Sequence, residues 1–322
     1  MGKIGIALLL SLAMLIAGNV EAQDWWPMFH RDLSHSGYST STGPETDEVL
    51  WSYTTGYPVT SSPAVADGKV YVGSRDNKLR CLDASNGDFI WSYTTGYEVW
   101  SSPAVADGKV YVGSFDDKVY CLDASNGDFI WSYTTGSWVS SSPAVADGKV
   151  YVGSYDRKVY CLDASNGDFI WSYTTGGWLH SSPAVADGKV YVGSEDNKVY
   201  CIDASTGDFI WSYTTGDMVD SSPAVADGKV YVGSDDYKVY CLDALNGDFI
   251  WSYTTGSSLS WVRSSPAVGN GKVYVGSYDY KVYCFGASAE PIPTLSEWGL
   301  IILALLLLAA GTIAVIRRPG IV

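Results

Sequence analysis

The pattern of apolar and polar positions repeats along the middle of the chain with a period of 40 residues. Within one unit, short alternating runs cover residues 62–66, 69–74, 78–83 and 88–93, and turn residues separate them. Alternation with a period of two, together with many Val, Ile, Tyr, Trp and Thr residues, indicates β-strands, and no window has the period of a helix. Each unit is therefore expected to fold as four short strands.

The turns within a unit indicate how these strands pair. Asp67-Gly68 and Ser85-Asn86-Gly87 supply the positive φ angles that tight hairpins require. Four antiparallel strands in about 40 residues is the size of one blade of a β-propeller. A β-solenoid is the alternative, although its coils are usually shorter and lack paired hairpin turns.

The first and last units are incomplete in complementary ways. The unit that begins at Ser264 stops after three strands, whereas residues 48–56 form a fourth strand that no other three precede. Residues 48–56 are expected to complete the last blade, because closing the ring removes free sheet edges that promote aggregation. The expected fold is all-β: a six-bladed β-propeller of four-stranded antiparallel blades, closed by an N-terminal strand, plus a C-terminal transmembrane helix.

The two ends of the chain predict export. Residues 1–22 have Lys3, an apolar run and a small-residue cleavage site at Ala22, as a signal peptide does. The uncharged stretch from Gly299 to Ile316 is followed by Arg317-Arg318, which predicts a transmembrane helix with a basic stop over 299–318 and a cytoplasmic tail before any processing. The protein is thus expected at a membrane, on the cell surface or in the periplasm.

Between these ends, we assign residues 23–47 to an N-terminal strap, 48–286 to the propeller and 287–298 to a linker with a sorting motif. That motif, Ile-Pro-Thr-Leu at 292–295, stands before the apolar stretch and the terminal arginines. This order resembles the Ile-Pro-Thr-Leu class of C-terminal sorting signals, which implies a membrane-embedded sorting enzyme as a partner. A plain membrane anchor through the C-terminal helix is the alternative.

Each repeat also carries a motif such as Cys81 to Trp91, with Asp83 and Gly87 at fixed spacing. It resembles the pyrroloquinoline-quinone-type propeller repeat, Ala-x-Asp-x-x-Thr-Gly-x-x-x-Trp, with cysteine in place of the alanine; Gly286 replaces the aspartate in the last blade. The resemblance implies that the tryptophan docks between neighbouring blades. These structural residues are Trp51, Trp91, Trp131, Trp171, Trp211 and Trp251.

The cysteines and the charge restrict the chemistry. The six cysteines occupy equivalent blade positions, roughly 15 Å apart on a six-fold ring, which is too far for disulfides, so we expect buried thiols between blades. The sequence contains no Cys-x-x-Cys grouping, so a zinc site is not expected. The net charge of −15 argues against a nucleic-acid partner. Calcium binding by the repeated Asp-rich turns remains an alternative.

Comparison of the six copies identifies two variable stretches, one before each Ser-Ser-Pro and one flanking the constant aspartate of the middle hairpin. Strand parity places both on one rim. Aromatic residues there suit carbohydrate or protein binding, while drift of surface loops after duplication is the alternative. The candidate binding residues are Tyr57, Tyr97, Trp100, Phe115, Trp138, Tyr155, Trp178, His180, Tyr237, Trp261 and Tyr278.

Catalysis has little support in the sequence. The only histidines are His30, His35 and His180, and no nucleophile motif occurs, so we predict that the protein is not an enzyme and binds no cofactor or metal. Quinoprotein dehydrogenases of the resembling family are larger and hold a calcium-bound quinone under an adjacent cysteine pair, which this chain lacks. Two alternatives remain: an envelope assembly scaffold resembling the propeller lipoprotein of outer-membrane insertion, and a quinone-dependent oxidoreductase.

Overall fold

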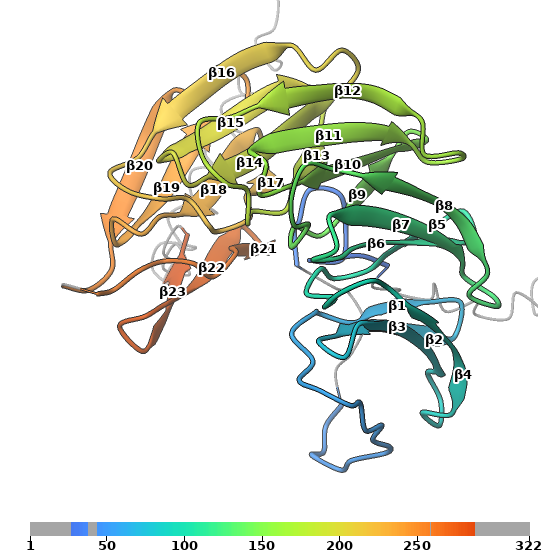
Figure 1. The fold of residues 1–322 in the computed structure, drawn as a ribbon. Helices are drawn as coiled ribbons and strands as arrows, with labels where there is room; N and C mark the ends of the chain where they lie inside the picture. Colours follow the sequence, from blue (N-terminus) through green and yellow to red (C-terminus); the bar gives the residue numbers. More distant parts are fainter. Residues whose placement is uncertain (1–26, 38–43, 258, 287–322) are drawn as a thin grey trace, which may run out of the picture. The chain divides into compact units, whose positions relative to one another are not determined.

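The computed structural model describes residues 27–37, 44–257 and 259–286, shown in colour in Figure 1. These residues contain no helix and form six antiparallel sheets, which confirms the all-β prediction of propeller-type blades. The chain divides into two compact units, residues 1–284 and 285–322, and the six sheets belong, up to Cys284, to the first.

Five sheets have four strands and the last has three, always in the order of the sequence from the inner to the outer strand. The inner strands of consecutive sheets are in contact, from the first sheet to the last. The strands are β1 (Ala64–Ala66), β2 (Lys69–Ser74), β3 (Lys78–Asp83), β4 (Phe89–Thr94), β5 (Ala104–Ala106), β6 (Lys109–Gly113), β7 (Lys118–Asp123), β8 (Phe129–Thr134), β9 (Ala144–Ala146), β10 (Lys149–Gly153), β11 (Lys158–Asp163), β12 (Phe169–Thr174), β13 (Ala184–Ala186), β14 (Lys189–Ser194), β15 (Lys198–Asp203), β16 (Phe209–Thr214), β17 (Ala224–Ala226), β18 (Lys229–Gly233), β19 (Lys238–Asp243), β20 (Phe249–Thr254), β21 (Ala267–Gly269), β22 (Lys272–Ser277) and β23 (Lys281–Phe285).

A β-bulge turns the repeated tryptophan inward. Cys81 of β3 pairs with Trp91 of β4, but the next residue, Leu82, pairs with Phe89, so that Ile90 is the extra residue. Phe89 and Ile90 are therefore both exposed, while Trp91 is buried. The same irregularity recurs in the other four-stranded sheets.

The tryptophans join consecutive sheets. Trp91 Nε1 donates a hydrogen bond to the carbonyl oxygen of Ala124 in the next sheet, over 3.3 Å. Its ring covers Gly127, whose φ is +77° and where a Cβ atom would lie 2.6 Å from the indole. Glycine is therefore required both for the turn and for the close approach. Equivalent bonds run from Trp51 to Ala84, Trp131 to Ala164, Trp171 to Ala204 and Trp211 to Ala244, while Trp251 is half-buried.

Residues 27–37 of the N-terminal strap run along the free edges of the inner strands. Its carbonyl groups accept backbone hydrogen bonds from four of the six sheets, so one short segment ties together strands that are far apart in sequence. His35 is buried, and its Nδ1 lies 3.2 Å from the Pro223 carbonyl oxygen. The four bonds run from Val105 to Pro27, Val185 to Leu33, Val225 to Ser34 and Val268 to Ser36, over 2.6 to 2.8 Å.

The predicted closing strand is not formed in this structure. Residues 48–56 have no strand geometry, and the sheet β21–β22–β23 has three strands. Trp51 nevertheless docks on the first sheet, and Gly56 N donates to Asp76 Oδ2 over 3.0 Å, as Gly96 does to Asp116 in the next repeat. The segment thus takes the position of an outer strand but lacks the neighbouring strand whose hydrogen bonds would make it one.

The last sheet is exposed on the face that carries Tyr274 and Val282, which are 40% and 78% exposed. The equivalent residues of the first sheet, Tyr71 and Leu79, are 1% and 0% exposed because the next sheet covers them. All six cysteines are free, and five are buried as predicted. The prediction is wrong for Cys284, which is exposed because it lies on the uncovered face of the last sheet.

Some predictions fall outside the described residues. The signal peptide over 1–22 and the helix over 299–318 both lie there. Within the part that the structure describes, no helix is long and apolar enough to cross a membrane.

Candidate binding rim

The structure brings the two variable stretches of every repeat together. Phe115 N donates to the Glu98 carbonyl oxygen and Tyr155 N to that of Trp138, each over 2.9 Å, and equivalent bonds occur in the other sheets. Val99 between the variable positions is fully buried, so the residues on either side of it point outward. We call this edge the variable rim: residues 57–60 and 75–77, their equivalents in the next four repeats, and 257–263 and 278–280 in the last.

Five rings of the variable rim form one continuous row, which we call the aromatic row: Trp100, Phe115, Trp138, Tyr155 and Trp178. Phe115 stacks on Trp100 with centroids 4.9 Å apart and on Trp138 with centroids 5.0 Å apart. Tyr155 is tilted against Trp138 at 5.6 Å and stacks on Trp178 at 5.6 Å. The row spans the entrances of three consecutive sheets, β5–β8, β9–β12 and β13–β16.

Stacking turns the ring faces toward one another and leaves mainly edges for a partner. Trp138 and Trp178 remain 46% and 52% exposed. At the start of the row, the Arg75 guanidinium lies 4.9 Å from the Trp100 ring centroid. Glu98 fixes both groups, because its Oε2 accepts from Arg75 Nε over 3.0 Å and from Trp100 Nε1 over 2.6 Å. These bonds lower the pKa of Glu98, the Trp100 bond most.

A charged cluster follows the aromatic row: His180, Glu195, Asp220, Asp235 and Arg263. Arg263 donates from Nε to Asp235 Oδ1 and from Nη2 to Asp235 Oδ2, and its Nη1 lies 3.5 Å from Asp220 Oδ2. Burial lowers the pKa of His180, which is therefore neutral at pH 7, and its Nδ1 lies 2.7 Å from the Tyr155 hydroxyl. Burial also raises the pKa of Glu195 and of Asp220. The cluster therefore has a net negative charge, carried by its carboxylates, and Arg263 is its cation.

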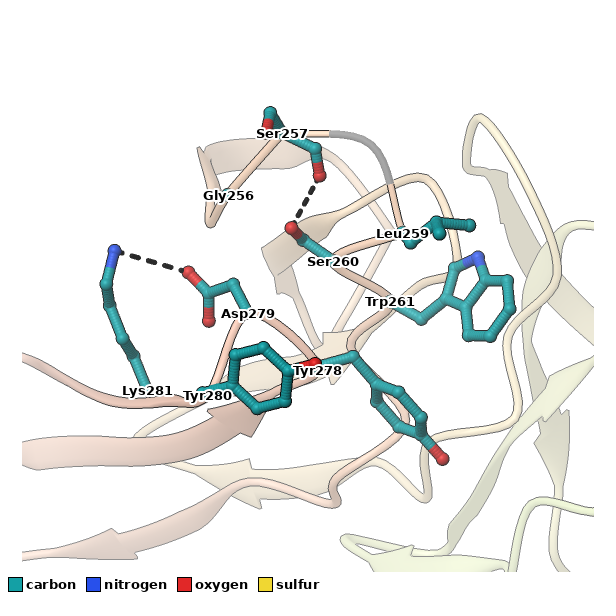
Figure 2. A pocket seen from close by; sticks show the side chains of 9 residues that line it. All are labelled: Gly256, Ser257, Leu259, Ser260, Trp261, Tyr278, Asp279, Tyr280 and Lys281. Atoms are coloured by element: carbon teal, nitrogen blue, oxygen red, sulfur yellow. Dashed lines mark hydrogen bonds and ion pairs between the residues drawn. The ribbon is translucent and has the colours of Figure 1, made fainter.

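The variable rim ends at the last sheet in a cavity of about 600 Å³, shown in Figure 2. Trp261 and Tyr278 meet there edge to face, with centroids 5.6 Å apart and planes at 62°. The Arg263 guanidinium lies 5.0 Å from the Trp261 ring centroid. Tyr280 and the ion pair of Asp279 and Lys281 complete this side of the cavity.

The remaining candidates are less well connected. Tyr57 and Tyr97 are 66% and 51% exposed. Tyr237 is half-buried with a φ of 71°, and its carbonyl oxygen accepts from Thr255 N, so it shapes a turn. The candidate list missed charged neighbours of the aromatic residues, although comparison of the copies marks the same positions as variable. These are Arg75, Glu98, Glu195, Asp220, Asp235 and Arg263.

The Asp-rich turns lie outside the variable rim and use their oxygens internally. Asp83 Oδ1 accepts from Ser85 N over 2.8 Å and from the Ser85 hydroxyl, and the pKa of Asp83 is lowered by these bonds. Within residues 27–37, 44–257 and 259–286, no group of three His, Cys, Asp or Glu side chains is arranged to hold a metal ion.

Comparison with known families finds a match for the repeats and another for the tail. The family described as outer membrane protein assembly factor BamB matches residues 37–137 and 116–298, most of the chain. The chain belongs to this BamB-like family. The IPTL-CTERM motif matches residues 290–319, which confirms the C-terminal sorting signal.

Solved structures agree with the BamB-like fold. BamB from Moraxella catarrhalis is 21% identical, with 76% of each chain covered and a TM-score of 0.66. A quinohemoprotein alcohol dehydrogenase from Pseudomonas putida HK5 is 18% identical with a TM-score of 0.70, covering 84% of this chain but 59% of the dehydrogenase. The designed protein Ika8 is 19% identical, with 70% of each chain covered and a TM-score of 0.64. No curated protein matches in sequence.

Proposed function

We propose that this exported propeller is a non-catalytic binding module that takes a carbohydrate or protein ligand on its variable rim. The observation that carries the proposal is the aromatic row, in which five rings from three sheets form one apolar ridge. A contiguous exposed aromatic surface with charged neighbours is typical of an interface, whereas scattered aromatic residues are not.

The internal repeats add a second argument. The copies keep most of the buried residues and turns, while the charge and size of the rim residues differ from one repeat to the next. The charged cluster continues the aromatic row, so the rim offers an apolar half and a negative half. Such a surface gives affinity through the rings and selectivity through the charges.

The test compares two double variants of the purified full-length chain. Trp138→Ala/Trp178→Ala truncates the aromatic row, and Phe129→Ala/Phe169→Ala removes two similarly exposed rings from outer strands β8 and β12. Glycan arrays and affinity capture identify a ligand, and titration calorimetry measures the affinity. The first variant is expected to lose at least about tenfold in affinity and the second less than about twofold. Unchanged affinity in the first variant would rule out the aromatic row as the site.

A second candidate function is envelope assembly, which the match to the BamB family favours. In that case the aromatic row would bind a protein of an outer-membrane insertion complex. Co-purification of such a complex with the full-length chain, lost in Trp138→Ala/Trp178→Ala, would favour this function. Isolation of the chain with a quinone absorption band would instead contradict the non-catalytic proposal.

The tail and the ends of the propeller belong to the same proposal. The chain would be held at a membrane through residues 299–318 until a sorting enzyme recognises the motif at 292–295. Mass spectrometry of the mature C-terminus tests this processing. The propeller would close when residues 48–56 pair with β23, which covers the exposed face of Tyr274 and Val282.

A further inference from the structure

The cavity at the last sheet exists because this repeat is longer than the others. Four residues connect Thr-Gly to Ser-Ser-Pro in the other repeats, whereas seven, residues 257–263, do so here. The Ser260 carbonyl oxygen accepts from Thr255 Oγ1 over 3.2 Å and from Ser277 Oγ over 3.1 Å. The Tyr97 carbonyl oxygen receives the same two kinds of bond from Thr95 and Ser114. The added residues therefore precede Ser260.

This extension supplies one wall of the cavity. Ser257 and Leu259 line it, and the Ser260 hydroxyl donates to the Ser257 carbonyl oxygen, as Figure 2 shows. Leu259 is 65% exposed, with a φ of 69° that is unusual for a leucine. The wall thus offers the exposed hydroxyl group of Ser257 and the apolar side chain of Leu259 opposite the hairpin of Tyr278 and Tyr280.

The rings of this cavity differ from those of the aromatic row. Tyr278 and Tyr280 are 55% and 101% exposed, and Trp261 meets Tyr278 at 62° rather than face to face. Rings that do not stack on one another keep faces for a ligand. In Figure 2 the three side chains come from two segments of the chain and lie around the cavity.

A polar pair lies among these rings. The Asp279 side chain is 10% exposed and its Oδ1 is buried with no hydrogen-bond partner, while its Oδ2 accepts from the Tyr283 hydroxyl over 2.6 Å and lies 3.5 Å from Lys281 Nζ. Asp116 and Asp196 have the same unpartnered oxygen in other repeats, but here the residue lines a cavity. Because Oδ1 is buried, Oδ2 is the Asp279 oxygen to which a ligand hydroxyl would donate, and Lys281 balances its charge, so the cavity favours a neutral ligand with hydroxyl groups.

We propose that the cavity lined by Trp261, Tyr278 and Tyr280 binds a neutral saccharide, and we call it the saccharide pocket. A sugar ring has an apolar C–H face for an aromatic ring and hydroxyl groups at its edge for Asp279 and Ser257. The volume of about 600 Å³ is that of a small-ligand site. This inference rests on the proposed binding function and assigns the carbohydrate to this end of the variable rim, with the aromatic row left for other contacts.

The experiment uses the full-length chain, a neutral-glycan array and titration calorimetry with the glycans that bind. Deleting residues 257–259 leaves Thr-Gly-Ser-Trp-Val before the last connection, the same order as residues 135–139, so the variant is expected to fold. This deletion and Tyr280→Ala are each expected to weaken glycan binding at least tenfold. Phe129→Ala, which removes an exposed ring from outer strand β8, is the matched control and is expected to change it less than threefold.

The other outcomes separate the saccharide pocket from the proposed function. Glycan binding lost in Trp138→Ala but kept in the deletion variant overturns the pocket and leaves the aromatic row as the site. If the chain captures a protein but binds no glycan, the saccharide pocket is likewise overturned. If neither a glycan nor a protein binds, both proposals fail. Circular dichroism of each variant excludes misfolding as the cause of a loss.

Discussion

Phe115 and Trp138 lie face to face, with ring centroids 5.0 Å apart and planes 6° from parallel, although they belong to different repeats. Trp100 covers the other face of Phe115 at 4.9 Å. Phe115 is therefore held between two indoles and connects the sheets β5–β8 and β9–β12 at their variable edge. The aromatic row should act as one unit, whose central ring contributes to stability as well as to any binding surface.

Removing that central ring should destabilise the fold. Phe115→Ala loses two stacked contacts, and we expect the free energy of unfolding to fall by about 1–3 kcal/mol, measured by urea denaturation. Tyr97→Ala, at an exposed position on the same rim, is the control and should change it by less than about 0.5 kcal/mol. Equal losses in the two variants would mean that the stacking contributes nothing.

Gly127, which the ring of Trp91 covers, provides a test of how neighbouring sheets are joined. Gly127 and Gly108 both have positive φ, +77° and +71°, but a Cβ at Gly127 would lie 2.6 Å from Trp91 whereas one at Gly108 meets nothing within 4 Å. Gly108→Ala should cost about 1 kcal/mol for the backbone alone. Gly127→Ala should cost roughly 2 kcal/mol more, since it displaces the indole. Thermal unfolding of both variants measures the difference, and equal costs would contradict the docking role of Trp91.

Much of the fold could be predicted because its determinants are local. Alternation over 69–74 and 78–83, with a positive-φ residue, Asn77, between the two runs, specifies hairpins wherever it occurs. Strand parity likewise predicts that the two variable stretches share an edge. These features depend on neighbouring residues and are the same in every repeat.

What could not be predicted depends on contacts between distant segments. The alternation of apolar and polar residues does not determine the angle between the ring planes of Phe115 and Trp138. The sequence therefore could not show whether these rings stack on each other or leave their faces open to a ligand. The path of the strap is set by N–H groups of the inner strands, such as that of Val185, which donates to the Leu33 carbonyl oxygen, and no sequence motif identifies this path. Cys284 follows the same Lys-Val-Tyr as four of the five buried cysteines, and only the missing neighbouring sheet makes it exposed. The cavity likewise follows from an extension whose hydrogen bonds place Ser260 where Tyr97 lies in a shorter repeat.

The strap should make stability depend on pH through His35. Burial, and next to it the nearby His30, lower the pKa of His35 from 6.5 to about 3. Between these values the unfolded chain binds a proton at this position that the folded chain does not, so stability falls as the pH drops from 6.5 toward 3. At pH 4.5 this loss is about 2–3 kcal/mol relative to pH 7.

The His35→Gln variant removes this titration while His30 and the carboxylates remain. Its free energy of unfolding should be lower than that of the wild type at pH 7, and the difference should shrink by about 2–3 kcal/mol at pH 4.5. Urea denaturation at several pH values gives both curves. Parallel curves for the two proteins would show that His35 is not buried in the neutral form.

Closure of the propeller can be tested by a disulfide. In the first sheet Leu79 pairs with Tyr93, and the same register would place Val282 of β23 opposite Tyr53. Directly opposed residues of antiparallel strands have Cα atoms about 4.5–5.5 Å apart, within reach of a disulfide. Tyr53→Cys/Val282→Cys should therefore oxidise within one chain. The test is made in a Cys284→Ser background, because Cys284 is the exposed native thiol.

The closed form should be visible in both migration and stability. Non-reducing electrophoresis should give a faster-moving monomer, and the oxidised variant should unfold at a higher temperature than the reduced one, because the bond joins residues 229 positions apart (282 minus 53) and restricts the unfolded chain. Tyr53→Cys/Lys272→Cys is the matched control, since residue 272 of β22 pairs with β21 and lies outside the proposed register. A disulfide between two chains would indicate strand exchange between copies. Failure of the designed pair to oxidise at all would mean that residues 48–56 do not complete the last sheet.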